Sequence, residues 1–236
     1  MNHRNKINIK RYLLPAIIIV LSLSLSLVTQ AASSAKYTTN KVNKSKTYGS
    51  GRIKATVYYQ KVKLKGNSKA IKQINKAIQK DCNDSLKSEN VKSLYSYAKQ
   101  RSQSSGSEEY FNYAKQKISY NRNGVISIKV STYWYAGGVY NTDVYGLNYS
   151  LKTGKRLTLK DVCKGSSYKI KDSVIKAIRK EAGANTSDYQ WNTINSYSTN
   201  KFCYYLTKCK AKVCFEPYEI AYGGWSREYS IKSKYK

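Results

Sequence analysis

Few residues in this sequence are of a type that could do chemistry. His3 is the only histidine, and it precedes an apolar run that would be removed with a signal peptide. A mature chain without histidine has no His-activated nucleophile and no imidazole metal ligand, which excludes Ser-His-Asp and Cys-His enzymes and the usual zinc hydrolases. Only 13 Asp and Glu remain for carboxylate-only chemistry such as glycoside hydrolysis. The sequence therefore predicts a protein that is not an enzyme, with no catalytic residue; a carboxylate-only wall hydrolase is the remaining enzymatic alternative.

The five cysteines do not show the spacing of a metal site. No C-x-x-C occurs among Cys82, Cys163, Cys203, Cys209 and Cys214, so the sequence predicts no metal ligand and no cofactor. An exported chain could pair four of them in disulfides and leave one over. Cysteine is also an ordinary small buried residue, and the pairing stays open.

Two segments place a Gly-Gly pair beside aromatic residues, at 133–140 and 222–225. Glycine lets a backbone approach a ligand closely, and aromatic rings offer flat contact surfaces to sugars or partner proteins. With the nearby F-E-P-Y-E-I-A segment (215–221), this predicts a ligand-binding set of Tyr140, Pro217, Tyr218, Glu219, Tyr222 and Trp225. The alternative is a pair of tight turns with their rings in the core, which the strand alternation favours for Trp134. For Glu219 a structural pairing, for instance with a lysine, is favoured over catalysis.

The N-terminus has the order of an export signal. Four basic residues precede an uncharged run from Leu13 to Val28, and small residues follow up to Ala35. The run of 16 residues is short for a membrane span. Residues 1–35 are therefore predicted to be a signal peptide, with an uncleaved N-terminal anchor, the only expected membrane contact, as the alternative. Either way the rest of the chain is expected to be secreted or associated with the cell envelope.

The charge balance points to a polyanionic partner. The chain has 43 Lys and Arg against 13 Asp and Glu, a net charge of +30, and loss of the four signal cations would leave +26. Outside the membrane the candidates are an anionic cell-wall polymer or peptidoglycan, and anionic lipid head groups; export argues against nucleic acid, the usual partner of such charge. Part of the lysine content is explained equally well by solubility.

Periodicity predicts the elements that position these residues. Polar residues 36–51 indicate a flexible linker, 53–59 a half-buried strand, and 70–95 an amphipathic helix after an N-cap at Ser68. Asn123-Gly124 predicts a hairpin between strands 110–120 and 126–134, and a second hairpin is expected at 145–159. A helix from about Ile170, a strand pair at 202–215 and a last strand near Tyr229 follow. The predicted fold is α+β, with two sequential units of antiparallel sheet, 52–140 and 141–236, each with one packed helix.

Two of these motifs together resemble a known family. The segment T-G-K-R-L-T-L (153–159) and the segment F-E-P-Y-E-I-A (215–221) are similar to the extracellular domain of RsiV-type anti-sigma factors and to the non-catalytic N-terminal region of the peptidoglycan deacetylase PdaC. The resemblance covers residues 50–234, PdaC-like in the first unit and RsiV-like in the second. It implies a two-part envelope ectodomain, which in RsiV-type proteins senses lysozyme.

Two departures limit what the resemblance implies. About a dozen residues precede the apolar run, too few for a sigma-binding segment, and Tyr140 stands where the family often has histidine. No deacetylase domain fits on the chain. The sequence thus predicts an exported binding module for an anionic wall polymer or a wall-associated protein, with a lysozyme-binding sensor or inhibitor as the alternative.

Overall fold

A computed structural model describes residues 34–104, 106–138 and 140–236. The predicted signal peptide, 1–35, lies almost entirely outside these residues, so the fold does not bear on it. Within the described residues, no helix combines the length and the apolar character that a membrane crossing requires. The described residues belong to one compact unit by their contacts.

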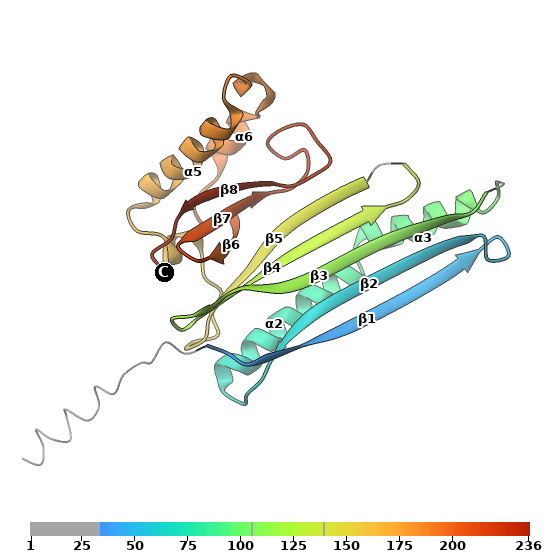
Figure 1. Ribbon diagram of the computed structural model, residues 1–236, viewed down its shortest axis with the longest axis horizontal. Helices are drawn as coiled ribbons and strands as arrows, with labels where there is room; N and C mark the ends of the chain where they lie inside the picture. Colours follow the sequence, from blue (N-terminus) through green and yellow to red (C-terminus); the bar gives the residue numbers. More distant parts are fainter. Residues whose placement is uncertain (1–33, 105, 139) are drawn as a thin grey trace, which may run out of the picture. The chain divides into compact units, whose positions relative to one another are not determined.

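The first sheet has five strands in the order of the sequence (Figure 1). They are β1 (Tyr37–Tyr48), β2 (Ile53–Leu64), β3 (Glu108–Arg122), β4 (Val125–Tyr135) and β5 (Tyr140–Ser150). All neighbours are antiparallel except β2 and β3, which are parallel. The parallel pair arises because helices α2 (Lys69–Leu86) and α3 (Glu89–Arg101) form a crossover between the two strands. The predicted Asn123-Gly124 turn joins β3 to β4, with both residues at positive φ.

The expectation of a flexible linker at 36–51 is wrong, because most of this segment forms the edge strand β1. Its twelve residues pair with β2 along their whole length, although only Val42 and Tyr48 are partly buried. Such a strand is held by its ladder of backbone hydrogen bonds rather than by an apolar face. It therefore lacks the hydrophobic alternation by which strands are predicted.

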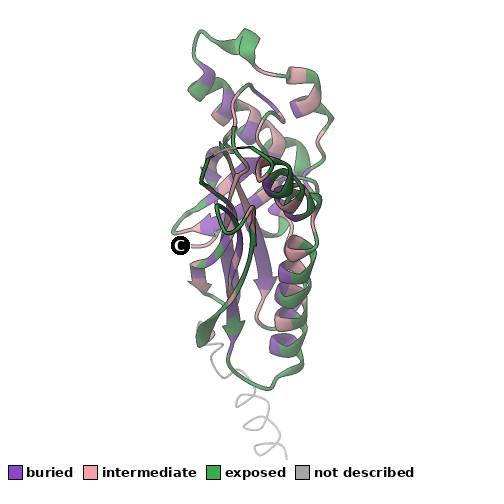
Figure 2. Cartoon of the chain, turned by 90° about the vertical axis from the view of Figure 1, so that its right-hand side faces the viewer, coloured by how far each residue is buried: buried purple, intermediate pink, exposed green. Residues whose placement is uncertain are grey.

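The predicted long helix at 70–95 is two helices that cover the same face of the sheet. Ser68 caps α2 as expected, with its Oγ accepting from the backbone N–H of Ile71 at 3.2 Å, and the isoleucine stripe of α2 is buried. The chain leaves helical geometry at Lys87 and restarts after Ser88. Figure 2 shows helical turns along one side of the sheet, with buried residues between the two layers.

The second sheet is a three-stranded antiparallel sheet with one long helix against it. Strands β6 (Cys203–Thr207), β7 (Lys210–Phe215) and β8 (Arg227–Lys232) pair in order, and α5 (Ser167–Ala182) packs on them. Three short helices complete the described chain, namely α4 (Leu159–Val162), η2 (Thr186–Asp188) and α6 (Trp191–Ser196). This confirms the α+β class with two sheets. Since β5 belongs to the first sheet, the division falls after Ser150 rather than at 140, and the expected second hairpin is reduced to a single bridge, Tyr149 to Arg156.

The two sheets are joined by polar contacts on the face of the first sheet that lies opposite α2 and α3. The side-chain amide of Asn148 donates to Tyr204 O at 2.6 Å, and the backbone N–H of Leu206 donates to Ser127 Oγ at 2.8 Å. Nearby, the ammonium of Lys129 contacts both carboxylate oxygens of Glu228, at 3.1 and 3.3 Å. These contacts fix the second sheet, and with it the 216–226 loop between β7 and β8, against β5.

Candidate functional site

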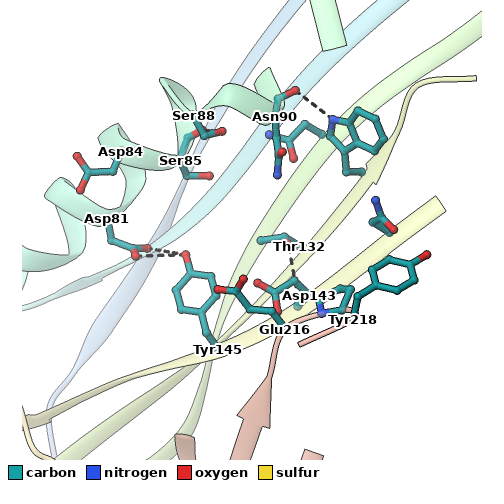
Figure 3. Close-up of a pocket in the computed structure, with 14 residues that line it drawn as sticks. Asp81, Asp84, Ser85, Ser88, Asn90, Thr132, Asp143, Tyr145, Glu216 and Tyr218 are labelled. Carbon is teal, nitrogen blue, oxygen red and sulfur yellow. Dashed lines mark hydrogen bonds between the residues drawn. The ribbon is translucent and has the colours of Figure 1, made fainter. Parts of the chain in front are cut away.

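A cleft opens on the helix-covered side of the first sheet, next to β5 (Figure 3). One cavity of about 490 Å³ and an adjoining one of about 600 Å³ share Asp81, Asp143, Tyr145 and Glu216 in their walls. The C-terminal part of α2 forms one wall, strands β4 and β5 the floor, and the turn after β7 the other wall. Together the cavities are lined by five carboxylates, Asp81, Asp84, Asp143, Glu216 and Glu219, and the second cavity also by two cations, Arg156 and Lys201. We call this the acidic cleft.

Asp81 is the most strongly held of these carboxylates. Its oxygens accept from Tyr59 OH at 2.6 Å, from Tyr145 OH at 3.1 Å and from Gln116 Nε2 at 3.3 Å. Burial raises the pKa of the Asp81 carboxyl above its ordinary value despite these hydrogen bonds and the charge of Arg156. Burial also raises the pKa of both tyrosines, so that they remain hydrogen-bond donors at neutral pH.

The opposite wall is a turn held by Glu219. Its carboxylate accepts from the backbone N–H of Glu216 at 2.6 Å and from Tyr197 OH. Glu219 therefore has a structural role, and its observed partners are a tyrosine and a backbone amide rather than a lysine. The turn presents Glu216 to the cleft, where burial and the charges of Asp143 and Glu219 raise the pKa of its carboxyl.

Asp143 projects from β5 between the two walls. Its Oδ1 accepts from Ser226 Oγ at 2.6 Å and from the backbone N–H of Val144 at 2.7 Å. Beside it the side-chain carbonyl oxygen of Asn141 is buried in the cleft and accepts no hydrogen bond from the described residues. The first cavity thus offers carboxylate and amide oxygens, which are acceptors, and its lining contains no lysine or arginine.

The structure brings three of the six predicted binding residues to this cleft, whereas Tyr140, Tyr222 and Trp225 line neither cavity. Pro217 and Tyr218 line it, and Glu219 lies in the adjoining cavity. The 222–226 segment docks on the start of β5, where the Thr142 backbone N–H donates to Gly224 O and Ser226 N–H donates to Thr142 O, both at 3.0 Å. This leaves four rings exposed, which we call the aromatic rim: Tyr140, Tyr218, Tyr222 and Trp225, at 50%, 52%, 79% and 55% exposure.

Other residues of the cleft were not predicted. Trp134, expected in the core, is half-buried, lines the cleft and donates its indole N–H to Asn90 O at 3.0 Å. Asp81, Asp84, Asp143 and Glu216 lie on three separate segments, and no local pattern marks them as neighbours. The only available signal was their scarcity, since a chain of net charge +30 has few acids to place.

The described residues contain no group of three His, Cys, Asp or Glu side chains arranged to hold one metal ion. The first cavity, lined by Asp81, Asp84, Asp143 and Glu216, is suited to a ligand that carries positive charge and donates hydrogen bonds. A hydrogen bond in which the donor or the acceptor is ionised is about twice as strong as one between two neutral groups.

All five cysteines are thiols in the structure, with Cys203 and Cys214 directly opposite each other in β6 and β7. Burial raises the pKa of four of them, to about 11 for Cys163, while Cys209 is exposed. Because the thiolate is the reactive form, we expect one fast-reacting thiol in the native protein and five in denaturant, measured with a chromogenic disulfide reagent. The Cys209→Ser variant should lose the fast phase; two or more fast thiols in native protein would contradict the expectation.

Comparison with known proteins locates the fold but not an activity. No protein-family model matches the chain, and no curated protein matches it. The crystal structure of a DUF3298 family protein from Pseudomonas aeruginosa PAO1 is similar, with a TM-score of 0.55 and 18% identity over 85% of this chain and 91% of that chain. A member of the same family from Bacteroides fragilis has a TM-score of 0.60 and 13% identity over 86% and 92%. The chain therefore has the fold of DUF3298 structures, a family of domains of unknown function.

Proposed function

We propose that this protein is an exported, non-enzymatic binding module of the cell envelope whose acidic cleft receives a cationic segment of a wall-associated protein. The observation that carries the proposal is the charge distribution. Five of the chain's 13 acids line one cleft together with only two of its cations, Arg156 and Lys201, although the chain as a whole has a net charge of +30. Electrostatic complementarity of this kind selects partners and speeds their association.

The aromatic rim supports a protein as the occupant. Tyrosine, tryptophan and arginine are the residue types that most often dominate binding energy at protein interfaces, and Arg227 stacks on the Trp225 ring at 5.1 Å. Among these rings Tyr218 lines the cleft itself and would provide an apolar contact beside a desolvated ion pair. An anionic polymer would be repelled by these carboxylates, so the polymer of the sequence prediction does not fit this cleft.

A lysozyme-like protein is the alternative that this charge pattern favours specifically. Animal-type lysozymes are cationic, and the long-range repulsion from a basic chain is screened beyond about 8 Å at physiological salt. At contact distance the local acids of the cleft would decide the sign of the interaction. The motif resemblance to RsiV-type proteins supports the same partner, and the export signal would put the two in the same compartment.

Titration calorimetry with an animal-type lysozyme tests the proposal. We expect a Kd on the order of 1 µM or tighter, lost when the lysines of the lysozyme are acetylated. The Asp84→Lys variant should bind about tenfold more weakly, because it replaces a cleft acid with a like charge. The matched control is Asp172→Lys on α5, because Asp84 and Asp172 both form exposed i,i+4 pairs with a lysine and only Asp84 lines the cleft.

Three results would count against the proposal. Absence of heat at micromolar concentrations would remove lysozyme as the partner. Equal losses in Asp84→Lys and Asp172→Lys would show that the cleft is not the binding site. Export would be contradicted if the protein were found only in the cytoplasm and mass spectrometry showed that it still carries its N-terminal segment.

A further inference from the structure

The first sheet carries a second group of aromatic residues that the acidic cleft does not use. Six rings on β2 to β5 form one connected set, which we call the aromatic face: Tyr58, Phe111, Tyr113, Tyr133, Tyr135 and Tyr140. Each ring lies next to at least one other, with centroid distances of 4.7 to 6.5 Å. The shortest is Phe111–Tyr113 at 4.7 Å, and the longest is Tyr133–Tyr140 at 6.5 Å. Only Tyr140 is shared with the aromatic rim.

Strand register explains why these rings share one face. Phe111, Tyr135 and Tyr140 are consecutive partners across β3, β4 and β5, and Tyr58, Tyr113 and Tyr133 are consecutive partners across β2, β3 and β4. Residues two apart on a strand point to the same side, so the two rows lie next to each other.

The aromatic face is the side of the sheet that α2 and α3 leave open (Figure 1). On the helix side the neighbouring positions are closed, as at Ala114 and Val130, which are 2% and 0% exposed. The second sheet contacts the open side around Ser127 and Gly146, at the far end of β4 and β5. None of the six rings is fully buried, and Tyr140 is half exposed. An open aromatic patch of this kind typically marks an interaction site.

A row of lysines lies next to the aromatic face, two residues further along strands β1 to β3. Lys41 of β1 pairs with Gln60, and Gln60 pairs with Lys115 of β3, so both lysines point to the same side as the rings. Lys117 follows two residues later on β3, and all three lysines are exposed. At the opposite border Glu109 is paired with Lys54, at 3.5 Å. The charge next to the rings is therefore positive, in contrast to the acidic cleft on the other side of the sheet.

We propose that the aromatic face binds an anionic polysaccharide. Pyranose rings present flat C–H surfaces that stack on aromatic rings, and a flat open sheet side accommodates an extended strand of several sugars. Carboxylate or phosphate substituents on those sugars meet the lysine row, where charge-assisted hydrogen bonds form. This site is separate from the acidic cleft, so that one molecule holds a wall glycan on one side and a cationic protein on the other.

Binding to three probes separates stacking from charge. The probes are a hyaluronan decasaccharide, which has both sugar rings and carboxylates, an N-acetylglucosamine pentamer, which has rings without charge, and a polyphosphate of matched charge, which has no rings. We expect hyaluronan to bind most tightly, with an affinity that falls as salt is raised. Polyphosphate binding as tight as hyaluronan binding would overturn the proposal, because charge alone would then explain it.

Variants on the aromatic face give the decisive comparison. Tyr113→Thr with Tyr133→Thr replaces two rings with β-branched residues that favour strands, and should weaken hyaluronan binding on the order of tenfold or more. Tyr113→Phe with Tyr133→Phe keeps both rings and should bind nearly as wild type. Tyr168→Thr, which removes an 80% exposed tyrosine on α5, is the matched control and should have no effect.

Two further measurements keep the outcome interpretable. Thermal unfolding identifies any variant that fails to fold, and Lys115→Glu then provides an independent test that should weaken hyaluronan and leave the neutral pentamer unchanged. The cleft variant Asp84→Lys should keep full polysaccharide binding, which separates this site from the proposed function. Wild-type affinity in the folded double Thr variant and in Lys115→Glu would overturn the proposal.

Discussion

Replacing Gly146 by alanine is expected to destabilise the protein by about 3 kcal/mol, the upper end of what overpacking usually costs. A Cβ at this position would lie 1.7 Å from Tyr204 O, 2.4 Å from Tyr204 C and 2.9 Å from Tyr205 N. All three atoms are backbone, so no side chain can rotate away to make room. Strand β6 would have to move off β5, which would break the hydrogen bond of 2.6 Å from the Asn148 amide to Tyr204 O.

Urea unfolding of the variant measures this cost, and Gly138→Ala is the matched control. A Cβ added at Gly138 meets no atom within 4 Å, and its φ lies outside the left-handed region. We therefore expect the control to keep wild-type stability within about 0.5 kcal/mol. Because β7 leads into the turn at Glu216, the Gly146 variant should also lose binding at the acidic cleft. Equal stabilities for Gly146→Ala and Gly138→Ala would contradict the close packing of the two sheets.

The elements that were predicted correctly are those whose signal is local. Asn123-Gly124 has a conformational preference that needs no partner, and the isoleucine stripe of α2 repeats at helical spacing. Strand β1 has no such signal, because both of its faces are largely exposed. The parallel pairing of β2 with β3 depends on where the crossover places the chain, which periodicity does not describe.

The candidate site divides in the same way. Tyr140, Tyr222 and Trp225 were singled out because they stand near a Gly-Gly pair in the sequence, and Tyr218 because it lies in the segment 215–221; ligand binding by these rings stays a prediction. The acidic cleft was not predicted, because α2, β5 and the turn after β7 bring its carboxylates together only in the folded chain. Gly146 shows the same limit. The atoms that leave no room for a side chain at this position belong to Tyr204, a residue on the other sheet.

Asp81→Ala is expected to destabilise the protein by about 2 kcal/mol at pH 7, because it leaves two buried hydroxyl donors without their acceptor. These donors are Tyr59 OH and Tyr145 OH, whereas Gln116 Nε2 keeps its hydrogen bond to Tyr59 OH at 2.9 Å. Asp81→Asn keeps an acceptor oxygen in place and should cost less. Both substitutions also remove the Asp81 charge from the acidic cleft. Calorimetry against the animal-type lysozyme should therefore give a weaker Kd for both variants.

The pH dependence separates the charge of Asp81 from its hydrogen bonds. Burial raises the pKa of this carboxyl in the folded protein, so the folded state binds its proton more tightly than the unfolded state, whose pKa is about 3.9. The stabilisation from this group is complete below the unfolded pKa and is lost as pH rises through the folded pKa. In urea unfolding from pH 4 to 7.5, wild type should therefore lose stability relative to Asp81→Asn as pH increases. Asp84→Asn, which removes an exposed acid from the same helix, is the control for the general loss of an acid. A difference between wild type and Asp81→Asn that is constant over this range, or that grows in favour of wild type, would contradict a raised pKa of the Asp81 carboxyl in the folded protein.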